Sequence, residues 1–180
     1  MKITSLVKKS IALAVLAAAT LSANAASSNI THLGAASVGS PLSFNSGAVP
    51  VGEFSDYFTF TLPANHGSGY SVINFAVSQL FNTLLATVSL HSNADGTLFN
   101  ADDTLLSSTV VSSGNQLALT FGPSAASSYY LNVTGTANGT LGGLYNGAIS
   151  VTAVPEPETY ALLLAGLGLM GAIARRRGRK

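Results

Sequence analysis

Apolar and polar residues alternate along the middle of the chain, and this period of two constrains the fold more than any other sequence feature. Phe58, Phe60 and Leu62 alternate with tyrosine and threonine. Successive side chains of a β-strand point to opposite faces, so this pattern predicts strands with one buried face. The same pattern recurs in Ile73–Val77, Leu84–Leu90, Leu117–Phe121, Tyr129–Val133 and Tyr145–Val151.

Segments rich in glycine, serine, asparagine or proline separate these runs, at 63–69, 93–96, 112–115, 122–128 and 135–143. Weaker alternation at 30–33 and 42–44 predicts edge strands. No segment of this middle part shows a sustained helical period. The sequence therefore predicts an all-β fold, an antiparallel β-sandwich or jelly-roll-like domain over residues 26–154.

Basic and acidic residues occupy different parts of the chain. Between Ala26 and Val154 there are five acidic residues and no lysine or arginine, which gives a formal charge of −5. Binding to a phosphate backbone depends on several such cations, so nucleic acid is excluded as a partner. The basic residues are Lys2, Lys8, Lys9, Arg175, Arg176, Arg177, Arg179 and Lys180.

The first 25 residues have the features of a signal peptide. Lysines precede an apolar stretch from Ile11 to Leu21, which is too short to span a bilayer. Ala23 and Ala25 supply small residues at the positions that signal peptidase reads. We expect cleavage after Ala25, so that the mature protein begins at Ala26.

Residues 155–180 form a tail with three consecutive parts. Pro155-Glu156-Pro157 precedes an apolar run from Tyr160 to Ala174, and a basic terminus follows. The run would form a helix of about 22 Å, shorter than the ~30 Å hydrocarbon core, so it spans only with local thinning or snorkelling of its arginines. We expect the basic terminus to act as a membrane stop signal that stays cytoplasmic. The middle part would then lie on the other side of the inner membrane.

This combination of motif, apolar helix and arginine cluster resembles the PEP-CTERM sorting signal, which the membrane protease exosortase recognises. The resemblance implies a transient membrane anchor, removal of the tail and delivery of the body to the cell surface or extracellular matrix. It also implies association with exopolysaccharide, which PEP-CTERM proteins accompany.

Phe54, Asp56 and Phe58 resemble the signature of the FxDxF family of PEP-CTERM proteins. The layout of the body is similar to that of bacterial pre-peptidase C-terminal domains, which are β-sandwiches. The FxDxF family brings no established activity. Asp56 lies two positions from each phenylalanine, so on a strand its side chain points to the same face as theirs. A carboxylate on this inward face needs hydrogen-bond donors. We expect it to accept backbone N–H groups, with calcium ligation as the alternative.

A second set of oxygen ligands lies between residues 95 and 103. Asp95, Asn100, Asp102 and Asp103 form a candidate calcium site, because calcium prefers hard oxygen ligands and no basic residue competes. The alternative is a plain hairpin turn at 93–96, which Asp-Gly favours. No other cofactor is expected.

The leading functional hypothesis is a non-enzymatic surface or matrix protein with a polar β-face. A calcium-dependent carbohydrate-binding module is the alternative, with exposed tyrosines stacking on sugars. The histidines His32, His66 and His91 are scattered and predict ordinary surface roles. A hydrolase is disfavoured, because no nucleophile elbow or acid/base pair can be placed. The tyrosines considered for stacking are Tyr57, Tyr70, Tyr129, Tyr130 and Tyr145.

Overall fold

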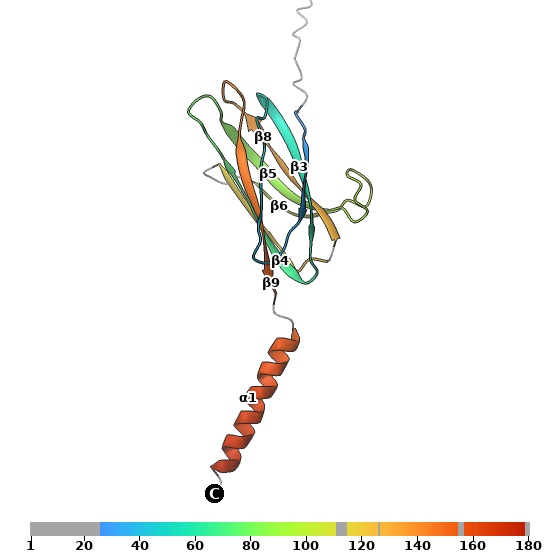
Figure 1. Ribbon diagram of the computed structural model, residues 1–180, viewed down its shortest axis with the longest axis vertical. Coiled ribbons are helices and arrows are strands. Elements are labelled where there is room, and N and C mark those ends of the chain that lie inside the picture. The colour runs from blue at the N-terminus through green and yellow to red at the C-terminus, as the bar shows by residue number, and fades with distance from the viewer. Residues whose placement is uncertain (1–25, 111–114, 126, 155–156, 179–180) are drawn as a thin grey trace, which may run out of the picture.

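The computed structural model describes residues 26–110, 115–125, 127–154 and 157–178. Within them, nine strands form two sheets and one helix follows (Figure 1). The all-β prediction for the body is confirmed. The elements are β1 (Ile30–Ala35), β2 (Leu42–Asn45), β3 (Gly52–Leu62), β4 (His66–Asn74), β5 (Thr83–Ser92), β6 (Leu105–Val110), β7 (Gln116–Phe121), β8 (Ser127–Ala137), β9 (Tyr145–Ala153) and α1 (Pro157–Arg177).

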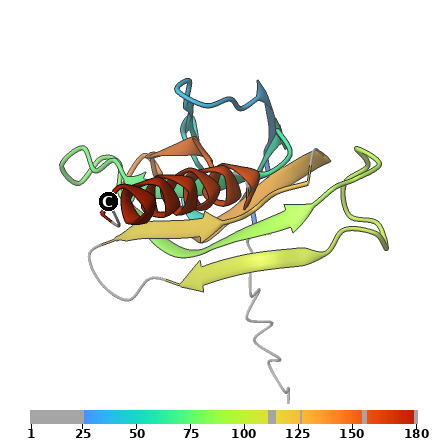
Figure 2. The same ribbon diagram turned by 90° about the horizontal axis from the view of Figure 1, so that it is seen from below.

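One sheet has five strands in the order β1-β3-β8-β5-β6, and the other has four in the order β2-β9-β4-β7. The described strand pairs are antiparallel except β1 with β3, which run parallel. Figure 2, seen from below, shows the neighbouring strands β5 and β6 with the loop that joins them projecting beyond their ends. The predicted edge strands correspond to β1 and β2.

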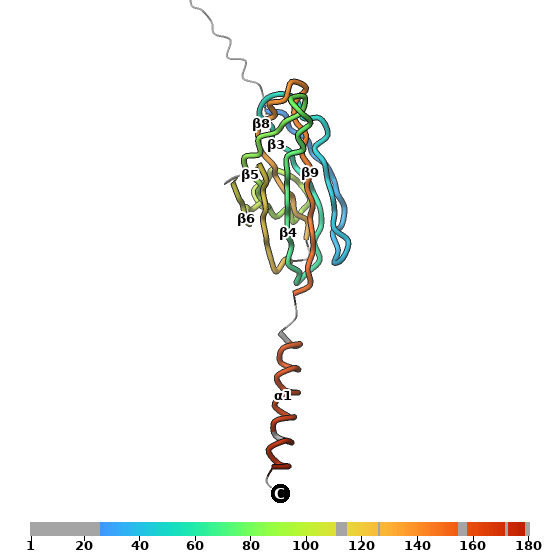
Figure 3. Tube along the Cα trace, turned by 90° about the vertical axis from the view of Figure 1, so that its left-hand side faces the viewer, coloured from blue at the N-terminus to red at the C-terminus, as the bar shows by residue number. Residues whose placement is uncertain are grey.

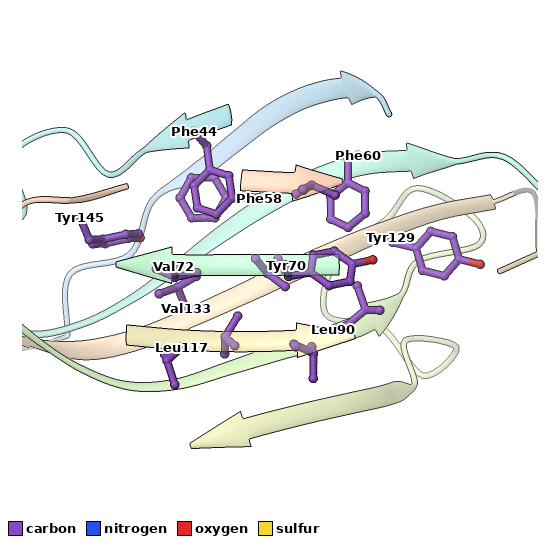
Figure 4. Packing of buried hydrophobic residues seen from close by; sticks show 14 of the residues in the cluster. Phe44, Phe58, Phe60, Tyr70, Val72, Leu90, Leu117, Tyr129, Val133 and Tyr145 are labelled. Atoms are coloured by element: carbon purple, nitrogen blue, oxygen red, sulfur yellow. The ribbon is translucent and has the colours of Figure 1, made fainter. Parts of the chain in front are cut away.

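The core lies between the two sheets and is rich in aromatic rings (Figure 4). Phe44 of β2 packs on Phe58 of β3 with ring centroids 4.1 Å apart, and Phe60 of β3 lies 5.8 Å from Tyr70 of β4. Along β3 every second side chain from Phe54 to Leu62 is buried. The alternation in the sequence therefore corresponds directly to the inner face of this strand.

Two strand predictions were wrong in detail. The inward residues of β4 are Tyr70 and Val72, whereas Ile73, Phe75 and Val77 are exposed. The strand starts earlier than predicted because Gly67 and Gly69 pair with β9 instead of breaking the sheet.

In β5, the pairing with β8 shifts register between Leu85 and Thr87. This irregularity reverses the parity of the strand, so Leu85 is buried while Leu84 is half exposed. The strand β6 did not appear in the sequence prediction, because its apolar residues are few and partly exposed.

The helix α1 leaves the end of β9 and extends away from the sandwich (Figures 1 and 3). Pro157 occupies its first position, where a missing N–H costs no intrahelical bond and the fixed φ of proline suits the start of a helix. Glu158 lies in the first turn and Arg175, Arg176 and Arg177 in the last, an arrangement that complements the helix dipole.

Candidate functional site

Asp56 lies inside the core and not at a surface site. Its side chain is 3% exposed, and Oδ1 accepts a hydrogen bond from the Asn29 backbone N–H at 3.2 Å. The Tyr145 hydroxyl donates to Oδ2 at 2.6 Å. Burial raises the pKa of the Asp56 carboxyl, and the two hydrogen bonds oppose that rise only in part.

The phenylalanines of the five-residue motif enclose the same tyrosine. Phe54 stacks on Tyr145 at 5.4 Å and Phe58 meets it edge-on at 6.3 Å. Tyr145 is fully buried, and its pKa is raised by burial and by the neighbouring Asp56 carboxylate. Sequence reasoning missed Tyr145 as the partner of Asp56. The signal was present, since a tyrosine on an inward strand position needs a partner for its hydroxyl.

The outward side of the five-stranded sheet, which we call the outer face, presents ordered rows of side chains. Tyr57, Asn132 and Ser89 face one another across β3, β8 and β5. Thr59, Tyr130 and His91 form the next row. Most of these side chains carry hydroxyl, amide or aromatic groups, which suits contact with a polar ligand.

Four rings on this face form what we call the aromatic cluster: Tyr57, His91, Phe99 and Tyr130. His91 stacks on Tyr130 with centroids 4.6 Å apart and planes at 4°. Phe99, from the loop after β5, meets Tyr57 edge-on at 4.7 Å and is 59% exposed. Burial lowers the pKa of His91, while the charge of Asp103 opposes this shift.

The expected set of exposed tyrosines was largely wrong. Tyr70, Tyr129, Tyr130 and Tyr145 are all buried, and only Tyr57 remains half-buried. Tyr130 points to the outer face but is covered by neighbouring rings. The ring that sequence reasoning missed is Phe99, whose position depends on how its loop folds back over the sheet.

An open groove of about 620 Å³ lies on the same side, between β1 and the loop after β5. His32 Nδ1 and Thr59 Oγ1 are 2.6 Å apart within it. Ser55 Oγ, on the same face, lies 3.0 Å from Tyr57 Oη and 3.0 Å from Asn132 Oδ1. The side chains lining the groove include Ile30, His32, Thr59, Asn93, Leu98 and Ser128.

The predicted calcium ligands lie in the loop connecting β5 to β6, which we call loop 93–104. Asp95 Oδ2 accepts from Asn100 Nδ2 at 2.8 Å, and Asp103 Oδ2 accepts from Asn100 N at 3.3 Å. Asp102 is exposed and stands apart from these contacts. Within the described ranges, no three His, Cys, Asp or Glu side chains group together as a metal site.

The tail residues fall only partly within the described structure. Arg175, Arg176 and Arg177 form the exposed end of α1, and its described leucines are exposed too. Ala23, Ala25, Pro155, Glu156, Arg179 and Lys180 lie outside the described residues.

The predicted membrane span is not supported by the helix that the structure describes. In the described part of the chain, no helix has both the length and the apolar character needed to cross a membrane.

Comparisons with solved structures give only distant similarities. The pre-peptidase C-terminal domain of a collagenase from Bacillus anthracis is 16% identical with a TM-score of 0.37, over 68% of this chain and 94% of that one. PliG from Aeromonas hydrophila, a periplasmic inhibitor of g-type lysozyme, is 17% identical with a TM-score of 0.35, over 70% and 100%. TM-scores this low establish neither a shared fold nor a shared function.

No curated protein matches the chain. Residues 153–180 match the family model described as the PEP-CTERM protein-sorting motif. This match covers the part of the chain whose motif, helix and arginine cluster predicted such a signal. The chain therefore carries a PEP-CTERM protein-sorting motif, which implies export, processing by exosortase and sorting to the cell surface.

Proposed function

We propose that this protein is a non-enzymatic component of the cell surface or extracellular matrix that holds a polysaccharide chain on its outer face. The observation that carries the proposal is the combination, on that face, of an open groove with the aromatic cluster. Sugar rings present an apolar C–H face and a rim of hydroxyls. Aromatic rings and the hydroxyl and amide groups beside them complement these two surfaces.

The negative charge of the body limits the kind of polysaccharide that this face could bind. The body has a formal charge of −5 and no lysine or arginine between residues 26 and 154. A polyanionic chain would be repelled unless cations lay between the two surfaces. The proposed ligand is therefore a neutral exopolysaccharide.

The lining of the groove is consistent with the non-enzymatic role that we propose. Among the described residues that line it there is no carboxylate. Most glycosidases need two carboxyl groups on either side of the scissile bond. Asp56 cannot supply one in this place, because both of its oxygens are engaged inside the core.

The tail gives the route to the cell surface. Leu162, Leu164 and Leu167 of α1 are each more than half exposed, and the last turn carries three arginines. In the proposed route, α1 enters the inner membrane transiently with its arginines on the cytoplasmic side, and exosortase then removes it. The body passes to the surface or matrix.

A calcium-dependent carbohydrate-binding module is the second candidate. Loop 93–104 supports it, because this loop supplies both Phe99 and several carboxylate and amide oxygens beside the groove. In that case binding to the polysaccharide would be lost in EDTA, whereas the leading proposal requires no cation.

Affinity electrophoresis of the full chain in mild detergent, against neutral and acidic exopolysaccharides with calcium or EDTA, tests the proposal. We expect retardation by a neutral polymer. Phe99→Ala should weaken binding about tenfold, since truncating a central aromatic contact costs on the order of 1.4 kcal/mol or more. Phe75→Ala is the matched control, because Phe75 is 51% exposed but lies beyond the end of β4. Equal affinity of wild type and Phe99→Ala would contradict the proposed face.

A further inference from the structure

Loop 93–104 contains three buried oxygen atoms that have no hydrogen-bond donor. These are Asn93 Oδ1, Asn100 Oδ1 and Asp103 Oδ1. They include every buried side-chain oxygen or nitrogen without a partner among the described residues. Buried polar groups are nearly always satisfied, so each of these acceptors needs an explanation, and their shared location in one loop points to a common one.

Two of these residues, Asn93 and Asp103, lie where the two ends of the loop come together. Ser92 N donates to Thr104 O at 2.9 Å, and the two hydroxyls are 2.7 Å apart. Asn93 and Asp103 are the next residues inward from this pair. Asn93 is only 2% exposed, so neither bulk solvent nor a mobile side chain can satisfy its oxygen.

The third oxygen belongs to Asn100, and a hydrogen bond from the nitrogen of the same side-chain amide fixes its orientation. Asn100 Nδ2 donates to Asp95 Oδ2, and Thr97 N donates to Asp95 Oδ1 at 2.8 Å. The amide nitrogen is thereby occupied, which leaves Oδ1 as the free end. Asp103 is fixed in a similar way, because its Oδ2 accepts from Phe99 N and Asn100 N and leaves Oδ1 unpaired.

We propose that loop 93–104 binds one calcium ion through Asn93 Oδ1, Asn100 Oδ1 and Asp103 Oδ1. Main-chain carbonyls and water complete the shell. An orphaned buried acceptor is satisfied by ordered water or by a cation, and residues 26–154 contain no lysine or arginine whose charged side chain could take the place of a cation. Calcium takes 6–8 oxygen ligands and accepts amide oxygens, whereas magnesium demands a tighter octahedral shell.

This ligand set differs from the one that the sequence predicted. Asn93 enters as a ligand, Asp102 drops out, and Asp95 becomes a positioning residue for Asn100. Only one ligand carries a full charge, so we expect a dissociation constant of about 10⁻⁴–10⁻³ M, as in other extracellular calcium modules. The inference does not depend on the polysaccharide proposal.

Terbium luminescence of the full chain in detergent tests the site, with terbium as a calcium analogue excited through tyrosine. We expect saturable binding of one ion per chain that calcium displaces and magnesium displaces poorly. Thermal melts should show a melting temperature that rises with calcium and falls in EDTA.

Asp103→Asn removes the charge and replaces one carboxylate oxygen by an amide donor, while the other oxygen can still accept from Phe99 N and Asn100 N. It should abolish saturable binding. Asp102→Asn makes the same charge change on the adjacent exposed side chain and should bind like wild type.

Absence of saturable binding by wild type at about 10 mM calcium, well above that range, would overturn the proposal whatever the variants do. The three oxygens would then be satisfied by ordered, buried water and not by a cation. An equal loss of binding in both variants would also overturn it, because it would reveal attraction by general surface charge.

Discussion

The carboxyl group of Asp56 links the stability of the core to pH. Burial raises its pKa above the ordinary value of 3.8, so the folded state binds this proton more tightly than the unfolded state. The stabilisation by this group is therefore complete below pH 3.8 and is lost as pH rises through the raised pKa. We expect this loss in thermal melts of wild type across acidic pH and its absence in Asp56→Asn. The same slope in both proteins would assign the pH dependence to other groups.

Removing the Asp56 side chain should destabilise the domain at every pH. Asp56→Ala leaves the Asn29 N–H and the Tyr145 hydroxyl without their partner, at a cost of about 1–3 kcal/mol. Asp56→Asn should cost less, because the amide can accept from Asn29 and donate to Tyr145 Oη. Urea unfolding measures both, and repeating it in EDTA shows whether calcium is involved. An unchanged midpoint for Asp56→Ala would exclude the structural role.

Strand parity predicted that Asp56 points inward, but it could not identify the donor. Tyr145 is separated from Asp56 by 89 positions, and the distance between them depends on how the two sheets pack. The positions of Asn93 and Phe99 were equally hidden, because they depend on the path of a loop without regular hydrogen bonding. Local alternation therefore predicts the face of a side chain, whereas its partners depend on tertiary packing.

At the level of strands, glycines explain part of the difference between the sequence prediction and the structure. Gly135 belongs to β8, where a Cβ would lie 2.4 Å from the Leu84 carbonyl oxygen and 2.9 Å from the Phe54 ring. Read locally, such a glycine indicates a turn. In this sandwich it instead lets a large ring approach the backbone, a reason that only tertiary structure supplies.

Gly147 in β9 gives a test of this packing role. A Cβ at this position would lie 2.1 Å from the Phe44 ring, which itself packs on Phe58. Gly147→Ala should therefore destabilise the domain by about 1–3 kcal/mol, the usual cost of overpacking. Gly69→Ala in neighbouring β4 is the control, because a Cβ there meets only the Ser150 hydroxyl, which can rotate. Urea midpoints compare the two, and equal values would contradict the packing argument.

For the whole molecule, the basic end of α1 is the testable element of sorting. Replacing the basic residues of the terminus by glutamine removes its positive charge: Arg175, Arg176, Arg177, Arg179 and Lys180. We expect export to continue, while tail removal and surface display fall, because cytoplasmic charge no longer stops the chain in the membrane. Fractionation and immunoblotting of cells follow both species. A variant that is processed and displayed normally would contradict this role.

The connection between β9 and α1 also sets a geometric limit on processing. Only residues 154–156 separate the last strand from the helix, and an extended segment of that length reaches about 10 Å. If α1 is held in the bilayer, this short connection would keep the folded sandwich close to the lipid surface during processing. The protease would then have to accommodate the folded sandwich directly beside the connecting segment. Otherwise the last few residues of β9 would have to leave the sheet, which would lengthen this segment.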